Sequence, residues 1–463
     1  QNPPLTSSHL MNPLFIPPSL NRLPATRAGL LGLFCAGVLL QSASAVTYYW
    51  DTNNSTAGFG TAGGTWVAPT VSQWSTDATG VSTPGASITT TTSDALNFGT
   101  ATDGLAAGTI TVSGTVNANS LTFGSASGNI TLSGGNISLG TSSAITVTNS
   151  ANTSAITQAI SSNITLGASP AWTVNNGGTV GTATLSVSGN VLGGSYGLTK
   201  SGNGTLILSG AANSWNGTTN VSAGTMTLSG SLATIGVINV NNSVLNITGN
   251  LTQTISGGPR TLNLSQYANQ NSTINVSGSG IFNAGNGMLM GEESATGARS
   301  FINQSGGTIN ANGSVFMAGQ NSTISVSGGT FNLGSSSLIM GVGTSVSTNS
   351  TLSVNGTGTV AMGYLELGKW SRNATALTVN LGDGTVGGNL SITNMSYGAG
   401  AGSGATTINF NGGTLTTNGT FSMATQAATV VKSGGAIFNV VGATTFTVSN
   451  NLTTDGTGGG LTK

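Results

Sequence analysis

The sequence has very little charge. Its 463 residues include nine Lys and Arg, nine Asp and Glu, one His and one Cys, so 4% are charged, whereas an ordinary soluble domain has about 25%. The formal net charge is zero. The chain therefore lacks the basic surface with which a nucleic-acid-binding protein neutralises phosphates, and with which a charge-driven membrane-surface protein binds. Disorder is disfavoured because 37% of the residues are apolar and they occur in short alternating runs.

The first 45 residues have the pattern of upstream residues followed by a secretory signal peptide. From Met11, two arginines precede an apolar run of 13 residues at 28–40, and small residues follow at 43–45. This run is shorter than the ~20 residues that span a bilayer. We therefore predict a signal peptide over Met11–Ala45, with Ala43 and Ala45 as its cleavage residues, and an exported chain.

Removal of the leader also removes His9 and Cys35, the only His and Cys of the chain. The remaining 418 residues would then form no disulfide, no Ser-His-Asp triad and no metal site built on His or Cys. We expect no metal and no cofactor. Only seven basic and nine acidic side chains remain, so the free energy of unfolding should change little between about pH 4 and 9.

Short β-strands dominate the chain after the leader. Between Asp103 and Lys200 there is no charged residue and no His. Apolar residues alternate there with Thr, Ser and Asn, as at 109–113, 129–133 and 183–187, which is the pattern of a half-buried strand. Gly-containing steps between these runs predict turns.

Repeats indicate how the strands are arranged. In the C-terminal half, a Gly followed by a small residue and an alternating strand recurs at intervals of 27, 22, 29, 26, 29 and 22 residues. These glycines are Gly280, Gly307, Gly329, Gly358, Gly384, Gly413 and Gly435. The period predicts an all-β fold, a right-handed parallel β-helix, with roughly 16 rungs if each rung takes about 26 of the 418 residues. The alternative is a β-sandwich array, because pairs of hairpins would give similar spacings.

The segment 46–105 is rich in Trp and Gly and differs from the repeats. Trp50, Trp66 and Trp74 are three of the six Trp residues. A solenoid needs a cap over its end, and we predict that these rings provide it; the alternative is a binding platform for sugar rings. The predicted regions are thus 1–45, the cap at 46–105, and β-helix at 106–235 and 236–463.

The segment from Leu198 to Gly230 reads LTKSGNGTLILSGAANSWNGTTNVSAGTMTLSG. It closely resembles the autotransporter-associated β-strand repeat, also called the passenger-associated transport repeat, except that Trp215 stands where a Tyr is usual. The matching positions are Gly197, Leu198, Thr199, Lys200, Gly202, Gly204, Thr205, Leu206, Leu208, Ser209, Gly210, Asn213, Trp215, Gly217, Thr219, Ala223, Gly224, Thr225 and Leu228.

The resemblance implies an exported passenger, a β-helical stalk at the surface of a Gram-negative-type cell. Its partners would be the outer-membrane export machinery or a C-terminal barrel not in this chain, and surface glycans are candidate ligands. Residues 460–463 repeat the Gly-Leu-Thr-Lys of 197–200, which predicts that a further copy begins there and that the chain is a fragment. We predict a non-enzymatic adhesin-like or scaffold role.

Parallel β-helices also include polysaccharide lyases and hydrolases, so an enzyme is the alternative function. Glu292, Glu293 and Glu366 are the candidate catalytic residues, because glycoside hydrolysis normally uses two carboxylates about 5 to 10 Å apart. Surface ion pairs on solvated loops are the simpler interpretation of these residues. A glycan-binding module that uses the three Trp residues is the third possibility.

Overall fold

The computed structural model describes residues 44–149, 154–178, 181–255, 260–292, 294–343, 348–368, 374–398, 405–423 and 426–463. The chain divides into units 1–43 and 44–463, and the second unit is described below. Apart from Ser44 and Ala45, the predicted signal peptide lies outside the described residues, as does Ala43. The described residues form strands and turns without a helix. They therefore contain no helix that is long and apolar enough to cross a membrane.

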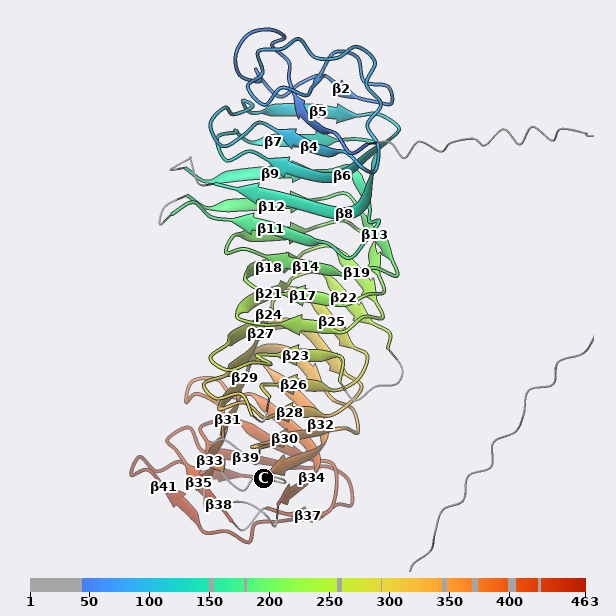
Figure 1. The fold of residues 1–463 in the computed structure, drawn as a ribbon. Helices are drawn as coiled ribbons and strands as arrows, with labels where there is room; N and C mark the ends of the chain where they lie inside the picture. The colour runs from blue at the N-terminus through green and yellow to red at the C-terminus, as the bar shows by residue number, and fades with distance from the viewer. Residues whose placement is uncertain are drawn as a thin grey trace, which may run out of the picture. The chain divides into compact units, whose positions relative to one another are not determined.

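The strands form three parallel ladders, faces A, B and C, which the chain visits in this order in each coil (Figure 1). Face A consists of β2 (Thr65–Trp66), β5 (Gly108–Val112), β7 (Ile130–Ser133), β9 (Ile156–Ile160), β12 (Ala183–Val187), β15 (Thr205–Leu208), β18 (Gly224–Leu228), β21 (Ser243–Ile247), β24 (Asn271–Val276), the first parts of β27 (Arg299–Ala311) and β29 (Asn321–Asn332), β31 (Thr348–Val354), β33 (Ala374–Leu381), β35 (Ala405–Phe410), β38 (Ala427–Val431) and β41 (Leu452–Thr454).

Face B follows face A around the coil. It consists of the first parts of β6 (Thr115–Phe123) and β8 (Asn136–Thr148), β10 (Asn163–Thr165), β13 (Val191–Gly194), β16 (Asn213–Trp215), β19 (Ser231–Thr234), β22 (Asn250–Gln253), β25 (Ile281–Ala284), the last parts of β27 and β29, the first parts of β32 (Thr359–Leu367) and β34 (Asn389–Tyr397), β36 (Thr414–Thr417), β39 (Ala436–Val440) and β42 (Leu461–Thr462).

Face C closes each coil. It consists of β1 (Thr47–Trp50), β4 (Ala95–Phe98), the last parts of β6 and β8, β11 (Ala171–Asn175), β14 (Leu198–Ser201), β17 (Thr219–Val221), β20 (Ile238–Val240), β23 (Leu262–Leu264), β26 (Met288–Met290), β28 (Val315–Met317), β30 (Ser337–Met340) and the last parts of β32 and β34. Beside it, β37 (Phe421–Ser422) pairs with β40 (Phe446–Thr447), and β3 (Trp74–Ser75) pairs with β1.

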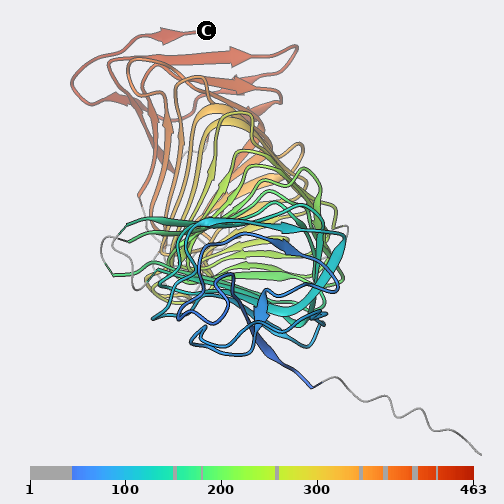
Figure 2. The same cartoon turned by 90° about the horizontal axis from the view of Figure 1, so that it is seen from above.

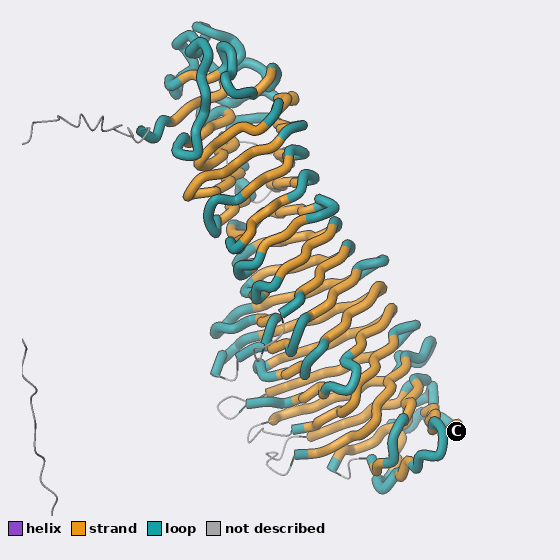
Figure 3. Tube along the Cα trace, turned by 90° about the vertical axis from the view of Figure 1, so that its right-hand side faces the viewer, coloured by secondary structure: helices purple, strands orange, loops and turns teal. Residues whose placement is uncertain are grey.

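This arrangement is the predicted parallel β-helix and excludes the β-sandwich array. Among the strand pairs that the structure describes, only β1 and β3 are antiparallel, whereas hairpins would make antiparallel ladders. Figure 3 shows the stacked coils from the side. The stack has about 13 turns, fewer than predicted, because the stretch 46–107 forms short strands and long loops instead of complete coils.

Alternation along each strand places one set of side chains inside every coil and the other set outside. On face C, the inner column runs through Leu121, Ile145 and Trp172 and continues to Met290 and Met317; all five side chains are buried. Seen along the stack in Figure 2, the three faces surround this interior. The core is therefore one continuous set of apolar columns along the coils, which offsets the scarcity of charge pairs.

Amide ladders stabilise the outer surface. On face A, Asn275 donates a hydrogen bond to Asn246 (2.8 Å), and Asn303 donates one to Asn275 (3.0 Å). On face C, Asn239 donates to Asn220 (2.8 Å), and Asn263 donates to Asn239. Because parallel strands place equal positions side by side, an Asn that recurs at one position forms such a ladder.

Candidate functional site

The segment that resembles the transport repeat forms part of two coils in the middle of the stack. It runs through β14 on face C, β15 on face A, β16 on face B, β17 on face C and β18 on face A. Its apolar motif positions face the interior, and Leu206, Leu208 and Leu228 are buried. The repeat is therefore a regular part of the solenoid core.

The glycines of the repeat lie where neighbouring coils approach closely. A Cβ atom on Gly197 would lie 2.1 Å from the carbonyl oxygen of Thr218 on the next coil. A Cβ on Gly230 would lie 2.1 Å from the carbonyl oxygen of Gly210 on the preceding coil. These distances leave no room for a side chain, so packing between coils accounts for both glycines.

Asn213 connects three successive coils from a buried position at the start of β16. Its Oδ1 accepts a hydrogen bond from the backbone N–H of Val191 (2.9 Å) on the preceding coil. Its Nδ2 donates to the carbonyl oxygens of Gly210 (2.9 Å) and, on the following coil, Ser231 (2.8 Å). The side chain thus gives the buried N–H of Val191 an acceptor. It also adds a second donor to the Gly210 carbonyl, which accepts from the N–H of Ser231 as well (3.0 Å).

Trp215 fills the interior next to Asn213. Its ring is buried, and its Nε1–H donates a hydrogen bond to the hydroxyl of buried Thr219 at 2.7 Å. Thr219 is another matching position of the repeat, so two motif residues satisfy each other. The indole gains buried area and still keeps its polar atom paired.

Lys200 is the unexpected member of this core. It lies in register with Trp172 on one side and Val221 on the other, and its side chain is fully buried. Lysine is almost never buried without a partner. The sequence alternation already places Lys200 on the same side of β14 as buried Leu198, but it does not reveal what holds the ammonium group.

Backbone carbonyl groups hold that ammonium. Lys200 Nζ donates hydrogen bonds to the carbonyl oxygens of Ser201 (2.8 Å), Gly202 (2.8 Å) and, on the next coil, Ala223 (3.2 Å). These three bonds use all three N–H donors of an ammonium group. Burial disfavours the charged form and lowers the pKa of Lys200 to about 8.

Lys200 should make stability depend on pH on the alkaline side. Its pKa is about 8 in the folded chain and 10.5 without burial. Between these values the unfolded chain binds more protons, so the free energy of unfolding rises with pH. We expect this rise in urea titrations of the wild-type chain between about pH 7 and 10.5, and its loss in Lys200→Met.

The difference between the two chains isolates Lys200, because every other titrating group is common to both. Parallel pH profiles of the wild type and Lys200→Met would contradict the lowered pKa. The free energy of unfolding is therefore no longer expected to stay constant up to about pH 9. Few groups titrate, but one buried lysine with a lowered pKa is enough to make stability depend on pH.

The two candidate catalytic carboxylates that the structure describes, those of Glu292 and Glu366, do not lie close together. Glu292 is partly exposed beyond the end of β26, and its Oε2 lies 3.9 Å from Arg260 Nη1. Glu366 is buried within β32 and accepts a hydrogen bond from the Ser337 hydroxyl at 2.8 Å. Three coil steps separate β26 from that part of β32, or about 14 Å at ~4.8 Å a step. Glu293 lies outside the described residues.

The surroundings of one carboxylate differ from the expectation. Glu366, expected in a solvated ion pair, is 6% exposed. In the described part of the chain, no group of three Asp, Glu, His or Cys side chains could hold a metal ion.

The three N-terminal tryptophans form one buried cluster. Trp74 contacts Trp50 edge to face, with ring centres 4.8 Å apart, and Trp66 in the same manner at 5.5 Å. The exposed fraction of each side chain is 1% or less. Phe98, 6.0 Å from Trp74, continues the cluster by stacking on Phe123 in the core. In this arrangement the three indole rings are buried and leave no exposed face for a sugar.

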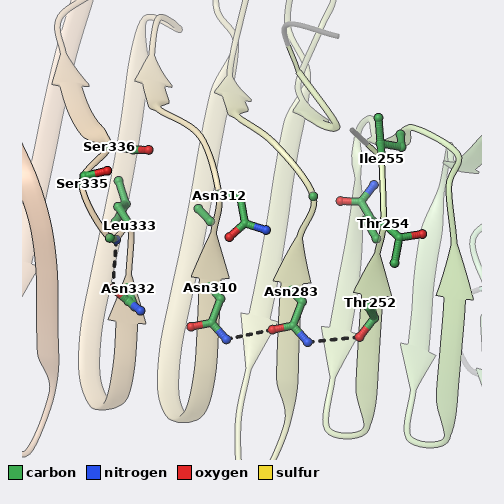
Figure 4. A pocket seen from close by; sticks show the side chains of 14 residues that line it. Thr252, Thr254, Ile255, Asn283, Asn310, Asn312, Asn332, Leu333, Ser335 and Ser336 are labelled. Carbon is green, nitrogen blue, oxygen red and sulfur yellow. Dashed lines mark hydrogen bonds between the residues drawn. The ribbon is translucent and has the colours of Figure 1, made fainter. Parts of the chain in front are cut away.

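A groove on face B was not anticipated from the sequence. It has a volume of about 700 Å³ and crosses four neighbouring strands, β22, β25, β27 and β29, where they end (Figure 4). Asn283, Asn310 and Asn332 lie at its edge, each at the same position of its strand. The recurrence of Ile-Phe-Asn, Thr-Ile-Asn and Thr-Phe-Asn is the signal that could have indicated a polar row.

Comparison with known proteins agrees with the motif. The family model of the passenger-associated transport repeat matches residues 198–231, which run from β14 to the start of β19. No curated protein and no solved structure matches the chain. The chain therefore contains a passenger-associated transport repeat, and the residues of this repeat form part of the core of a parallel β-helix.

Proposed function

We propose that this chain is an exported, non-enzymatic passenger that serves as a β-helical stalk at a bacterial cell surface, with an adhesin-like or scaffold role. The observation that carries the proposal is that the transport repeat forms part of two consecutive coils of the parallel β-helix that the described residues build. A stack held by apolar columns and backbone pairing is extended and needs neither disulfides nor ion-pair networks.

Export requires the leader that the sequence predicts at Met11–Ala45. The partner in this proposal is an outer-membrane export machinery or a C-terminal barrel that is not in this chain. A stalk role suits the faces of the stack, whose outer positions carry Thr, Ser and Asn in place of charges. The separation of Glu292 from Glu366, about three coil steps, favours display over hydrolysis by a pair of carboxylates.

Location and leader cleavage test this proposal together. In cells that produce the whole open reading frame, we expect protease added outside intact cells to degrade the chain, and N-terminal mass spectrometry to find Val46 as the first residue. Replacing Ala43 and Ala45 with Arg should block cleavage, because signal peptidases need small residues there. A periplasmic marker must stay intact in the same cells. A chain that is fully protected in intact cells, or that keeps its leader, would contradict the proposal.

A further inference from the structure

The groove on face B arises from unequal connections between neighbouring coils. Only Gly285–Gly287 connect β25 to β26, and only Asn312–Ser314 connect β27 to β28. On one side of these short turns, Thr254 and Ile255 extend beyond β22; on the other, Leu333–Ser336 extend beyond β29 (Figure 4). The short turns therefore form the floor and the longer segments form the walls.

A row of polar side chains runs along one edge of the groove. Asn283 Nδ2 donates a hydrogen bond to the Thr252 hydroxyl (3.1 Å), and Asn310 Nδ2 donates to Asn283 Oδ1 (2.8 Å). These bonds fix the orientation of both amides, as Figure 4 shows. A side-chain amide has two N–H donors and an oxygen with two acceptor positions. The ladder uses one N–H of each amide, so each keeps hydrogen-bonding capacity for a ligand.

The spacing and the absence of charge indicate the class of ligand. Successive side chains are about 4.8 Å apart along the stack, so a linear polymer aligned with it meets a hydrogen-bonding group at each step. None of the residues that line the groove is charged, and Ser335, Ser336 and Thr254 add hydroxyl groups. A groove of several hundred Å³ with a few fixed polar groups has the size and character of a ligand site.

We propose that this groove binds a neutral glycan chain that runs along the axis of the solenoid, with Asn283 and Asn310 as its main hydrogen-bonding residues. Sugar hydroxyls both donate and accept, and so complement amides whose two ends alternate along the row. A charged glycan or an acidic peptide would lose hydration there without meeting an opposite charge. Half-buried Ile255 supplies apolar contact for the C–H groups of a sugar ring.

Binding by the purified chain tests this inference. The probes are cellohexaose, laminarihexaose and maltohexaose, with polygalacturonate as the charged comparison, and isothermal titration calorimetry gives Kd. We expect binding of at least one of the three neutral probes, at least tenfold weaker in Asn283→Ala and in Asn310→Ala, because each loses a bidentate group. No binding of any neutral probe, or tighter binding of polygalacturonate, would overturn the inference.

Matched variants separate recognition from folding. Asn275→Ala and Asn303→Ala remove amides from the face A ladder in the same two coils, and they should bind the glycan as the wild type does. Equal loss in these controls would overturn the inference, because it would show that the amides act through the fold. This inference extends the proposed surface role, but purified protein tests it independently of export. A failure of export would not change the result of the glycan-binding experiment, and a lack of glycan binding would not change the result of the export experiment.

Discussion

Trp74→Ala should lower the free energy of unfolding of the N-terminal coils by about 4 kcal/mol, the typical cost of truncating a buried aromatic residue of this size. The Trp74 ring is almost fully buried between Trp50, Trp66 and Phe98. Its removal leaves a cavity at the end of the stack. The edge-to-face contacts with the two other indoles are lost as well.

The loss should also be local. A solenoid is stabilised by interactions between adjacent coils, so the coils nearest the cap depend on it most. We expect amide hydrogen exchange, measured by mass spectrometry, to become faster in β4, β5 and β6 and to stay unchanged in β31–β35. Urea titration followed by tryptophan fluorescence should give the size of the loss.

Tyr267→Ala is the control, because Tyr267 is 65% exposed and exposed substitutions change stability by about 0.5 kcal/mol or less. A similarly small effect of Trp74→Ala would contradict a structural role for the cluster. Faster exchange along the whole chain would contradict the local, coil-by-coil stabilisation.

The fold can be predicted from the sequence because the same pattern of strands and turns recurs in each coil of a solenoid. Period-two alternation defines each strand, and the spacing of Gly280, Gly307 and Gly329 defines the coil. The number of coils was harder to predict from the sequence. The loops between Trp50 and Ala95 have no period, and only the structure shows that this stretch has short strands in place of complete rungs.

Contacts between coils were harder to predict than the coils themselves. Alternation puts Lys200 inside the coil. One of the three carbonyl groups that accept hydrogen bonds from its ammonium group, that of Ala223, belongs to the next coil. The groove depends on the difference between the short turn at Gly285–Gly287 and the longer connection after Gln253, and no single segment carries that difference. Such features depend on register between strands about 20 to 30 residues apart, which local patterns do not fix.

The chain end shows the same limit. Residues 460–463 repeat the letters of 197–200. The structure puts Leu461–Thr462 on face B beside β39, whereas Leu198–Ser201 lies on face C beside β11. Four matching residues therefore do not define a position in the coil.

Asn213→Ala should lower the free energy of unfolding by about 3 kcal/mol, because three backbone groups each lose a hydrogen bond and a buried polar group left without a partner costs about 1 to 3 kcal/mol. The N–H of Val191 loses its acceptor, and the carbonyls of Gly210 and Ser231 lose a donor. Urea titration measures the loss. Asn216→Ala is the matched control within the repeat, because Asn216 is exposed, and it should change stability by about 0.5 kcal/mol or less.

Asn213→Asp gives a second measurement that truncation alone would not. The carboxylate can still accept from Val191, but it faces two carbonyl oxygens and cannot donate to them. Burial raises the pKa of such a carboxyl above its unfolded value of about 3.9. A carboxyl group whose pKa is raised in the folded chain destabilises the fold as pH increases. The free energy of unfolding of this variant should therefore be lower than that of Asn213→Ala near pH 7 and should recover towards pH 4. Equal stability at both values would contradict the buried, bridging position.

These two variants also distinguish two roles for the transport repeat. If Asn213 acts by joining three coils, its replacement should reduce stability in the purified chain, and any loss of export should follow that reduction. If the residue instead contacts the export machinery, purified Asn213→Ala should be as stable as Asn216→Ala and still fail to reach the surface. Asn213, Trp215 and Lys200 are all buried, out of reach of a partner in the folded chain. We therefore expect the first result, in which the repeat promotes export by making two coils that fold and hold together firmly.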